Sequence, residues 1–150
     1  MSTIQERIEN DKKVDFFAKV VAGDDVDAFE YIKFLATAAR IVDDIFDEFH
    51  NVSAKQCCCA FEILFVKIPT NKFYRKHQDL LLAHHIAMWN AWEASNILDK
   101  GDEVDKIYAH VLRDQVNEIL PLIALLTQGH DKMKEINGLI RTLFKKQLGE

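Results

Sequence analysis

The stretch DAFEYIKFLATAARIVDDIFDEFH, residues 27–50, decides the fold class. Its apolar residues recur at steps of three and four, the spacing of one face of an α-helix. The members of this apolar stripe are Phe29, Ile32, Leu35, Ala39, Val42, Phe46 and Phe49. The spacing predicts a long amphipathic helix from about Asp27 to His50, with the stripe turned toward a core.

The same helical spacing continues on both sides of this stretch. It predicts further helices from about Thr3 to Val21, from Ser53 to Pro69, from Thr70 or Asn71 to Leu98, from Asp102 or Glu103 to Gly129, and from about Asp131 onward. Ser53 and Gln56 have the spacing of a capping box at the start of their helix. Pro121 predicts a bend or restart near Asn117, because proline lacks an N–H and clashes with the carbonyl four residues earlier.

Composition supports the same fold class. The chain has 150 residues, 49% of them hydrophobic, but only 5 Gly and 2 Pro, which is too few turn residues for an all-β fold. Short loops between long helices favour an antiparallel arrangement. We therefore expect an all-α protein, an antiparallel helical bundle of five to six helices that forms a single domain over residues 1–150.

Two expectations concern the core of this bundle. The run CCCAFEILFV, residues 57–66, is apolar nearly all round, which is typical of a central buried helix or, less often, of a buried strand. We also expect Phe46, Leu64, Trp89 and Leu112 to share one core.

Charge and cysteine content exclude several classes of protein. With 24 acidic and 19 basic residues the net charge is −5, which argues against nucleic-acid binding. No apolar run reaches the roughly 20 residues of a membrane span, and the N-terminus lacks the apolar stretch of a secretory signal. Cys57, Cys58 and Cys59 point about 100° apart on a helix, so they cannot converge on one metal ion. We expect small buried thiols in the reducing environment of the cytoplasm.

An acidic cluster in residues 43–48 carries the strongest chemical signal. Asp43 and Asp47 lie about 40° apart on the helix and flank the apolar stripe, while Asp44 and Glu48 form a second pair turned further toward solvent. A divalent cation would relieve the repulsion between these carboxylates, and Mg²⁺ prefers carboxylate oxygens. A solvated acidic edge of the helix is the alternative interpretation.

Opposing ligands for such a cation are available on the predicted helix that ends at Leu98. Asn90 and Glu93 share one of its faces and can both bind Mg²⁺ through oxygen. We expect Asp43 and Asp47 to face a polar cavity within reach of this pair, with Glu62 as the alternative third carboxylate.

The segment Asp43-Asp44-Ile45-Phe46-Asp47 resembles the aspartate-rich DDxxD motif of the class I isoprenoid synthase family. This resemblance implies an all-α enzyme in which the aspartates bind Mg²⁺ and the metal holds a diphosphate. No second DDxxD motif occurs in this chain.

Two functions follow from these signals. The first is a Mg²⁺-dependent all-α protein that acts on a diphosphate or phosphate ester, with no catalytic residue identified and a small phosphorylated molecule as its ligand. The second is a non-catalytic helical module for protein–protein interaction or dimerisation, such as a homodimer, that uses exposed aromatic side chains at Phe73, Tyr74 and Trp92.

Overall fold

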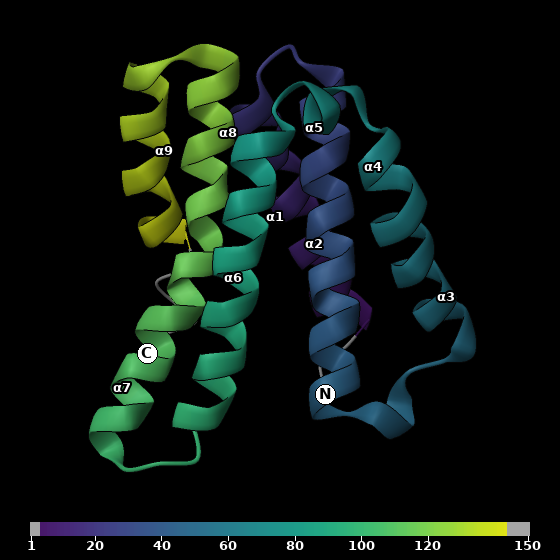
Figure 1. The fold of residues 1–150 in the computed structure, drawn as a ribbon, viewed down its shortest axis with the longest axis vertical. Coiled ribbons are helices and arrows are strands. Elements are labelled where there is room, and N and C mark those ends of the chain that lie inside the picture. The colour runs from purple at the N-terminus through teal and green to yellow at the C-terminus, as the bar shows by residue number, and fades with distance from the viewer. Residues whose placement is uncertain (1–3, 144–150) are drawn as a thin grey trace. The chain divides into compact units, whose positions relative to one another are not determined.

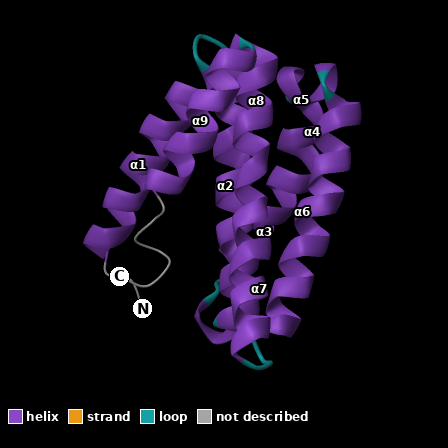
Figure 2. Cartoon of the chain, turned by 90° about the vertical axis from the view of Figure 1, so that its left-hand side faces the viewer, coloured by secondary structure: helices purple, strands orange, loops and turns teal. Residues whose placement is uncertain are grey.

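The computed structural model describes residues 4–143, and every regular element in that range is a helix (Figures 1 and 2). The all-α fold class predicted from the sequence is therefore confirmed. The chain divides into two compact units, Met1–Lys76 and His77–Glu150. The expectation of a single domain stays a prediction.

The first unit is built around the long helix that the sequence predicted. Its elements are α1 (Ile4–Ala22), α2 (Val26–Asp47), the 3₁₀ turn η1 (Phe49–Asn51), α3 (Ala54–Glu62), the π-helical turn η2 (Ile63–Lys67), α4 (Ile68–Thr70) and α5 (Lys72–Lys76). Helix α1 was predicted to begin at Thr3, which lies outside the described residues.

Local signals set the ends of these helices. The Asp25 carboxylate caps α2 by accepting a hydrogen bond from the Ala28 backbone N–H at 2.9 Å. The predicted capping box of Ser53 and Gln56 is confirmed at the start of α3. Helix α2 ends at Asp47 instead of His50, because the backbone leaves the helical conformation at the following residue and turns into η1.

The buried face of α2 is not centred on the predicted stripe. Its buried residues are Ala28, Tyr31, Ile32, Ala38 and Ile41. Ile32 belongs to the stripe, and each of the other four directly precedes a stripe position. The core-facing side is thus turned from the stripe by less than the 100° that separates consecutive residues. As a result Phe46, near the end of the stripe, is 52% exposed.

Aromatic rings fill the core of this unit. The centroid of the Tyr31 ring is 5.8 Å from that of Phe73 and 5.9 Å from that of Tyr74. All three side chains are buried. The prediction that Phe73 and Tyr74 are exposed aromatics for a partner is therefore wrong, because α5 packs them against α2.

The segment 57–66 is not the central buried helix that its composition predicted. Ala60 and Ile63 are buried, but Cys58 and most of the large apolar residues that follow are exposed. The α-helical register also changes to a π turn over Ile63–Lys67. Pro69 follows Phe65 by four residues. It has no N–H to donate to the Phe65 carbonyl, and its ring cannot approach that carbonyl closely, which accounts for the irregular helical register.

The second unit consists of α6 (Gln78–Leu98), α7 (Glu103–Gln115), the 3₁₀ turn η3 (Val116–Glu118), α8 (Ile119–Gln128) and α9 (His130–Leu143). Asp102 caps α7 through the Val104 and Asp105 backbone N–H groups, and Gly129 ends α8 at a φ of +96°, a conformation that favours glycine. The break predicted near Asn117 is confirmed: η3 interrupts the helix there, which places Pro121 in the first turn of α8, where its missing N–H has no helical acceptor.

The core of the second unit is made largely of small and branched residues. Its buried side chains include Leu81, Ala109, Ile123, Ile136 and Ile140. The prediction of one core shared by Phe46, Leu64, Trp89 and Leu112 is wrong. The first three are 52%, 44% and 52% exposed. Phe46 and Leu64 belong to the first unit, whereas Trp89 and Leu112 belong to the second.

Candidate functional site

The acidic cluster lies in the last turn of α2, and its members differ in exposure. Asp43 and Asp47 are exposed, Asp44 is half-buried, and Glu48 is the exposed C-cap residue. One carboxylate oxygen of Glu48 accepts a hydrogen bond from the Asn51 side-chain amide at 3.0 Å. The four carboxylates therefore spread around the end of the helix.

The other predicted ligands lie in the second unit. Asn90 and Glu93 are both exposed on α6. Glu62, the alternative, lies in the first unit, where its exposed carboxylate is 3.8 Å from the Lys67 ammonium. Its exposure to solvent explains how this carboxylate is accommodated on an otherwise apolar segment.

A metal site of three protein ligands is not gathered in the part of the chain that the structure describes. Within residues 4–143 no group of three or more histidine, cysteine, aspartate or glutamate side chains lies close enough together to hold a metal ion. The assignment of Asp43, Asp44, Asp47, Glu48, Asn90 and Glu93 to Mg²⁺ stays a prediction.

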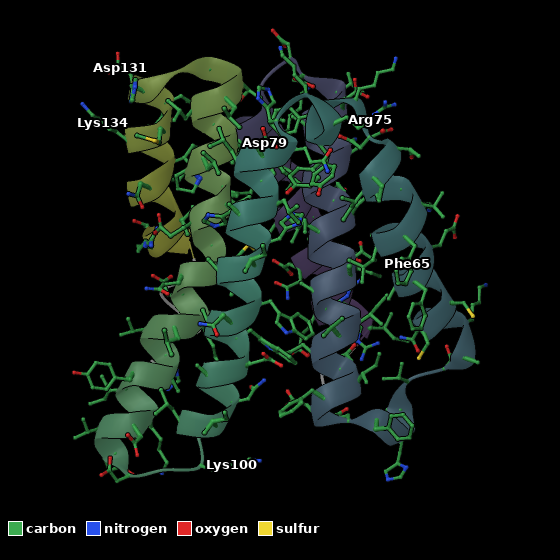
Figure 3. All side chains as sticks on the ribbon, in the orientation of Figure 1. Phe65, Arg75, Asp79, Lys100, Asp131 and Lys134 are labelled. Atoms are coloured by element: carbon green, nitrogen blue, oxygen red, sulfur yellow. The ribbon has the colours of Figure 1, made fainter. Side chains whose placement is uncertain are left out.

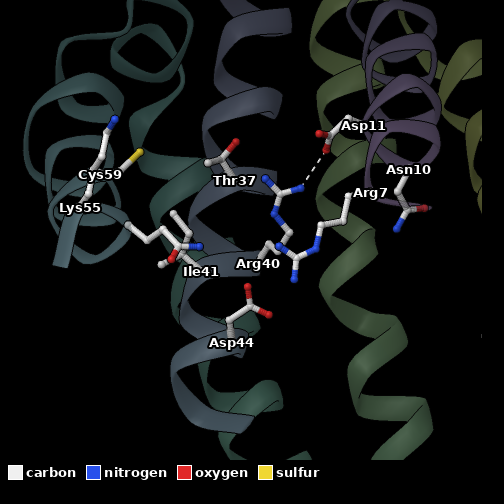
Figure 4. A pocket seen from close by; sticks show the side chains of 10 residues that line it. Arg7, Asn10, Asp11, Thr37, Arg40, Ile41, Asp44, Lys55 and Cys59 are labelled. Atoms are coloured by element: carbon white, nitrogen blue, oxygen red, sulfur yellow. Dashed lines mark hydrogen bonds and ion pairs between the residues drawn. The ribbon is translucent and has the colours of Figure 1, made fainter. Parts of the chain in front are cut away.

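The first unit contains a pocket of about 410 Å³ between α1, α2 and α3 (Figure 4). We call it the arginine pocket. It is lined by Arg7, Asn10, Asp11, Thr37, Arg40, Ile41, Asp44, Lys55, Gln56 and Cys59. Of the acidic cluster, this lining includes Asp44 but neither Asp43 nor Asp47.

The helix geometry explains which side chains meet in the pocket. Thr37, Arg40, Ile41 and Asp44 recur at steps of three and four, so they share one side of α2. Arg7 from α1 and Arg40 and Asp44 from α2 line the same pocket, and Figure 4 shows their side chains around it. Lys55 lies on the α3 side of the pocket.

The side chains that line the pocket carry a slight excess of positive charge. Its lining carries three cationic and two anionic side chains. An Arg40 guanidinium N–H donates to the Asp11 carboxylate at 2.8 Å, and both side chains are more than half exposed. An ion pair so exposed contributes about 0.2–1 kcal/mol, so an incoming anion can compete for Arg40.

Sequence reasoning missed most of this pocket. The ligands predicted from the sequence are carboxylates and one amide, and Arg7, Arg40 and Lys55 are not among them. The Arg40–Asp11 pair spans 29 positions in the sequence and joins two helices. A signal was present in Arg7 and Asp11, which are four residues apart and share one face of α1.

Two histidines of α6 have shifted proton affinities. Burial lowers the pKa of His84, and the Glu118 carboxylate opposes this shift more weakly. Burial also lowers the pKa of His85, with a further contribution from the neighbouring His84. The Nε2 atom of His84 is buried without a hydrogen-bond partner. Their surroundings thus favour the neutral form of both imidazoles.

Comparisons with known proteins identify no relative: no family model matches the chain, and no curated protein and no solved structure matches it either. No helix within residues 4–143 is both long and apolar enough to cross a membrane.

Proposed function

We propose that this chain binds a small phosphorylated molecule in the arginine pocket. The observation that supports the proposal is that two arginines, Arg7 from α1 and Arg40 from α2, line one pocket of about 410 Å³. Guanidinium groups are planar and bind phosphate oxygens in pairs, and this bond is stronger than an exposed ion pair such as Arg40–Asp11.

Magnesium enters the proposal as a partner of the ligand. Asp44 supplies one carboxylate on the pocket wall, and Mg²⁺ in proteins is often held by one or two carboxylates together with substrate phosphates. Residues 43–47 resemble the isoprenoid synthase motif, in which the metal holds a diphosphate. We therefore include in the proposal that the phosphorylated ligand is a diphosphate.

The architecture in this proposal is the antiparallel bundle of five to six helices expected from the sequence. The connections at residues 23–25, at 99–102 and at Gly129 are short, which favours antiparallel neighbours. The three cysteines are free thiols, which supports a reducing compartment such as the cytoplasm.

The test is a thermal unfolding experiment with inorganic pyrophosphate, with and without MgCl₂. A ligand that binds only the folded protein stabilises it by about 2.7 kcal/mol at a hundredfold excess over Kd. For a chain of this size that corresponds to a rise in Tm of roughly 5–10 °C.

Matched variants give the experiment its specificity. We expect Arg7→Met to abolish most of the pyrophosphate-induced rise in Tm. Arg75→Met is the control, because Arg75 is an exposed arginine of the same unit that does not line the pocket (Figure 3). No rise in the wild-type protein, or an equal loss in both variants, would contradict the proposal.

A further inference from the structure

The arginine pocket has room for more than a phosphate group. Its volume of about 410 Å³ lies in the range of pockets that bind whole small organic molecules. Along α2 its lining extends from Thr37 to Asp44, which is two helical turns or roughly 10 Å (Figure 4). Arg40 lies between these two residues, one turn from each. In the proposed function the phosphates bind at Arg40 and, through Mg²⁺, at Asp44, so the Thr37 end of the pocket is left for the organic part of the ligand.

The side chains around the pocket are nearly all polar. Of the ten lining residues, only Ile41 and Cys59 have side chains that are neither charged nor an amide or hydroxyl. An isoprenyl or other alkyl group would displace water from the polar groups without giving them a hydrogen bond in return, which is unfavourable. No aromatic side chain is among the described residues that line the pocket, so a nucleobase would have no ring to stack on.

The neutral polar groups of the lining combine hydrogen-bond donors with acceptors. The Gln56 side-chain oxygen accepts from the Ser53 backbone N–H and hydroxyl, at 2.8 and 3.0 Å, so its amide nitrogen is the part that donates to a ligand. Asn10 carries an amide and Thr37 a hydroxyl, and each of these groups both donates and accepts. A ligand hydroxyl also does both and can pair with any of the three, whereas an ammonium group only donates and a carboxylate only accepts.

We propose that the organic part of the phosphorylated ligand is a hydroxyl-rich group, a sugar, that binds toward Thr37. The class of ligand is then a sugar phosphate or a sugar diphosphate, and its assignment rests on the proposed function of the arginine pocket. Thr37 precedes Arg40 by three residues, about 4.5 Å along the helix axis. A sugar attached to a phosphate at Arg40 can span this distance.

Isothermal titration calorimetry with three phosphate monoesters, in the presence of MgCl₂, tests the class of ligand. Ribose 5-phosphate, pentyl phosphate and adenosine 5′-monophosphate share one phosphate group, so differences in Kd report on the group attached to it. We expect ribose 5-phosphate to bind at least about tenfold more tightly than pentyl phosphate, the effect of one or two hydrogen bonds. Adenosine 5′-monophosphate should bind no more tightly than ribose 5-phosphate, because the described lining offers its base no ring.

A variant of the pocket wall tests where the sugar lies. Thr37→Val removes the hydroxyl and keeps the shape of the side chain. We expect it to raise the Kd of ribose 5-phosphate by about two- to tenfold more than the Kd of inorganic pyrophosphate, which has no organic part. A purely structural effect would weaken both ligands equally. Thr70→Val is the matched control, because Thr70 is an exposed threonine of the same unit that does not line the pocket.

The two proposals fail in different ways. If inorganic pyrophosphate gives no rise in Tm, the proposed function is contradicted, and the sugar site with it. If pyrophosphate binds but ribose 5-phosphate binds no more tightly than pentyl phosphate, or less tightly than adenosine 5′-monophosphate, phosphate binding stands and the sugar site is overturned. An equal effect of Thr37→Val and Thr70→Val on the Kd of ribose 5-phosphate would overturn it as well.

Discussion

The sharpest test of the packing concerns Asn71, a buried polar residue of the first unit that is 6% exposed. Its side-chain oxygen accepts a hydrogen bond from the Tyr74 backbone N–H at 2.9 Å, in the position of an N-cap for α5. Its amide nitrogen donates to the backbone carbonyl of Asp27 at 2.9 Å. One side chain thus starts α5 and ties it to the first turn of α2.

The magnitude follows from these two bonds. Loss of an N-cap costs about 1 kcal/mol, and loss of the second hydrogen bond, to the Asp27 carbonyl, costs about 1–1.5 kcal/mol more. We therefore expect Asn71→Ala to lower the free energy of unfolding by about 2–2.5 kcal/mol. Ser53→Ala removes an exposed capping box at the start of α3 and is expected to cost only about 1 kcal/mol.

Urea denaturation at 25 °C, followed by circular dichroism, measures both variants. Asn71→Ser serves as an intermediate case, since its hydroxyl can still accept from Tyr74 but is too short to replace the amide that reaches Asp27. We expect it to recover about 1 kcal/mol relative to Asn71→Ala. If Asn71→Ala cost no more than Ser53→Ala, the bond to Asp27 would contribute nothing and the reasoning would be refuted.

Two further predictions concern protonation and metal binding. Because burial lowers the pKa of His84 and His85 below the value of about 6.5 in an unfolded chain, the unfolded state takes up more protons as the pH falls through this range. Their contribution to stability is therefore full above about pH 6.5 and is lost as the pH falls toward the lowered pKa. Between pH 7.5 and pH 5 the Tm of His84→Gln should therefore fall less steeply than the Tm of the wild type. Parallel profiles of Tm against pH would contradict this. In the pyrophosphate experiment, Asp44→Asn should remove the additional rise in Tm that MgCl₂ gives, whereas Asp43→Asn should retain it, because only Asp44 lines the pocket. The opposite order would mean that the metal binds outside the pocket.

Helix positions could be predicted from the sequence because their signals are local. The Ser53–Gln56 capping box and the effect of Pro121 each depend on a few neighbouring residues, and both are present in the structure. A cap or a proline acts through backbone groups within one turn, so its effect does not depend on what packs against the helix.

The buried face of a helix could not be predicted in the same way. Along α2 the apolar residues cover a wide arc, and the sequence does not say which part of it meets another helix. The structure buries Tyr31 and Ala38 instead of centring the core on Phe29 and Ala39. The choice depends on Phe73 and Tyr74, which pack on Tyr31 from more than 40 positions away.

The residues of the candidate site could not be predicted from the sequence, for a related reason. The acidic cluster is prominent in the sequence because its charges are adjacent, but adjacent residues of a helix point about 100° apart. Asp44 alone among them lines the arginine pocket. The residues that do meet there are brought together from three helices, and nothing in the local sequence of one helix specifies its neighbours.

Helix α3 lines the arginine pocket with only one of its faces. Gln56 and Cys59 turn toward the arginine pocket, and Ala60 is buried in the core. Phe61 and Phe65 lie on the side that solvent reaches. Because residues on different faces of a helix have different surroundings, a ligand in the arginine pocket can bind without contact with these two rings.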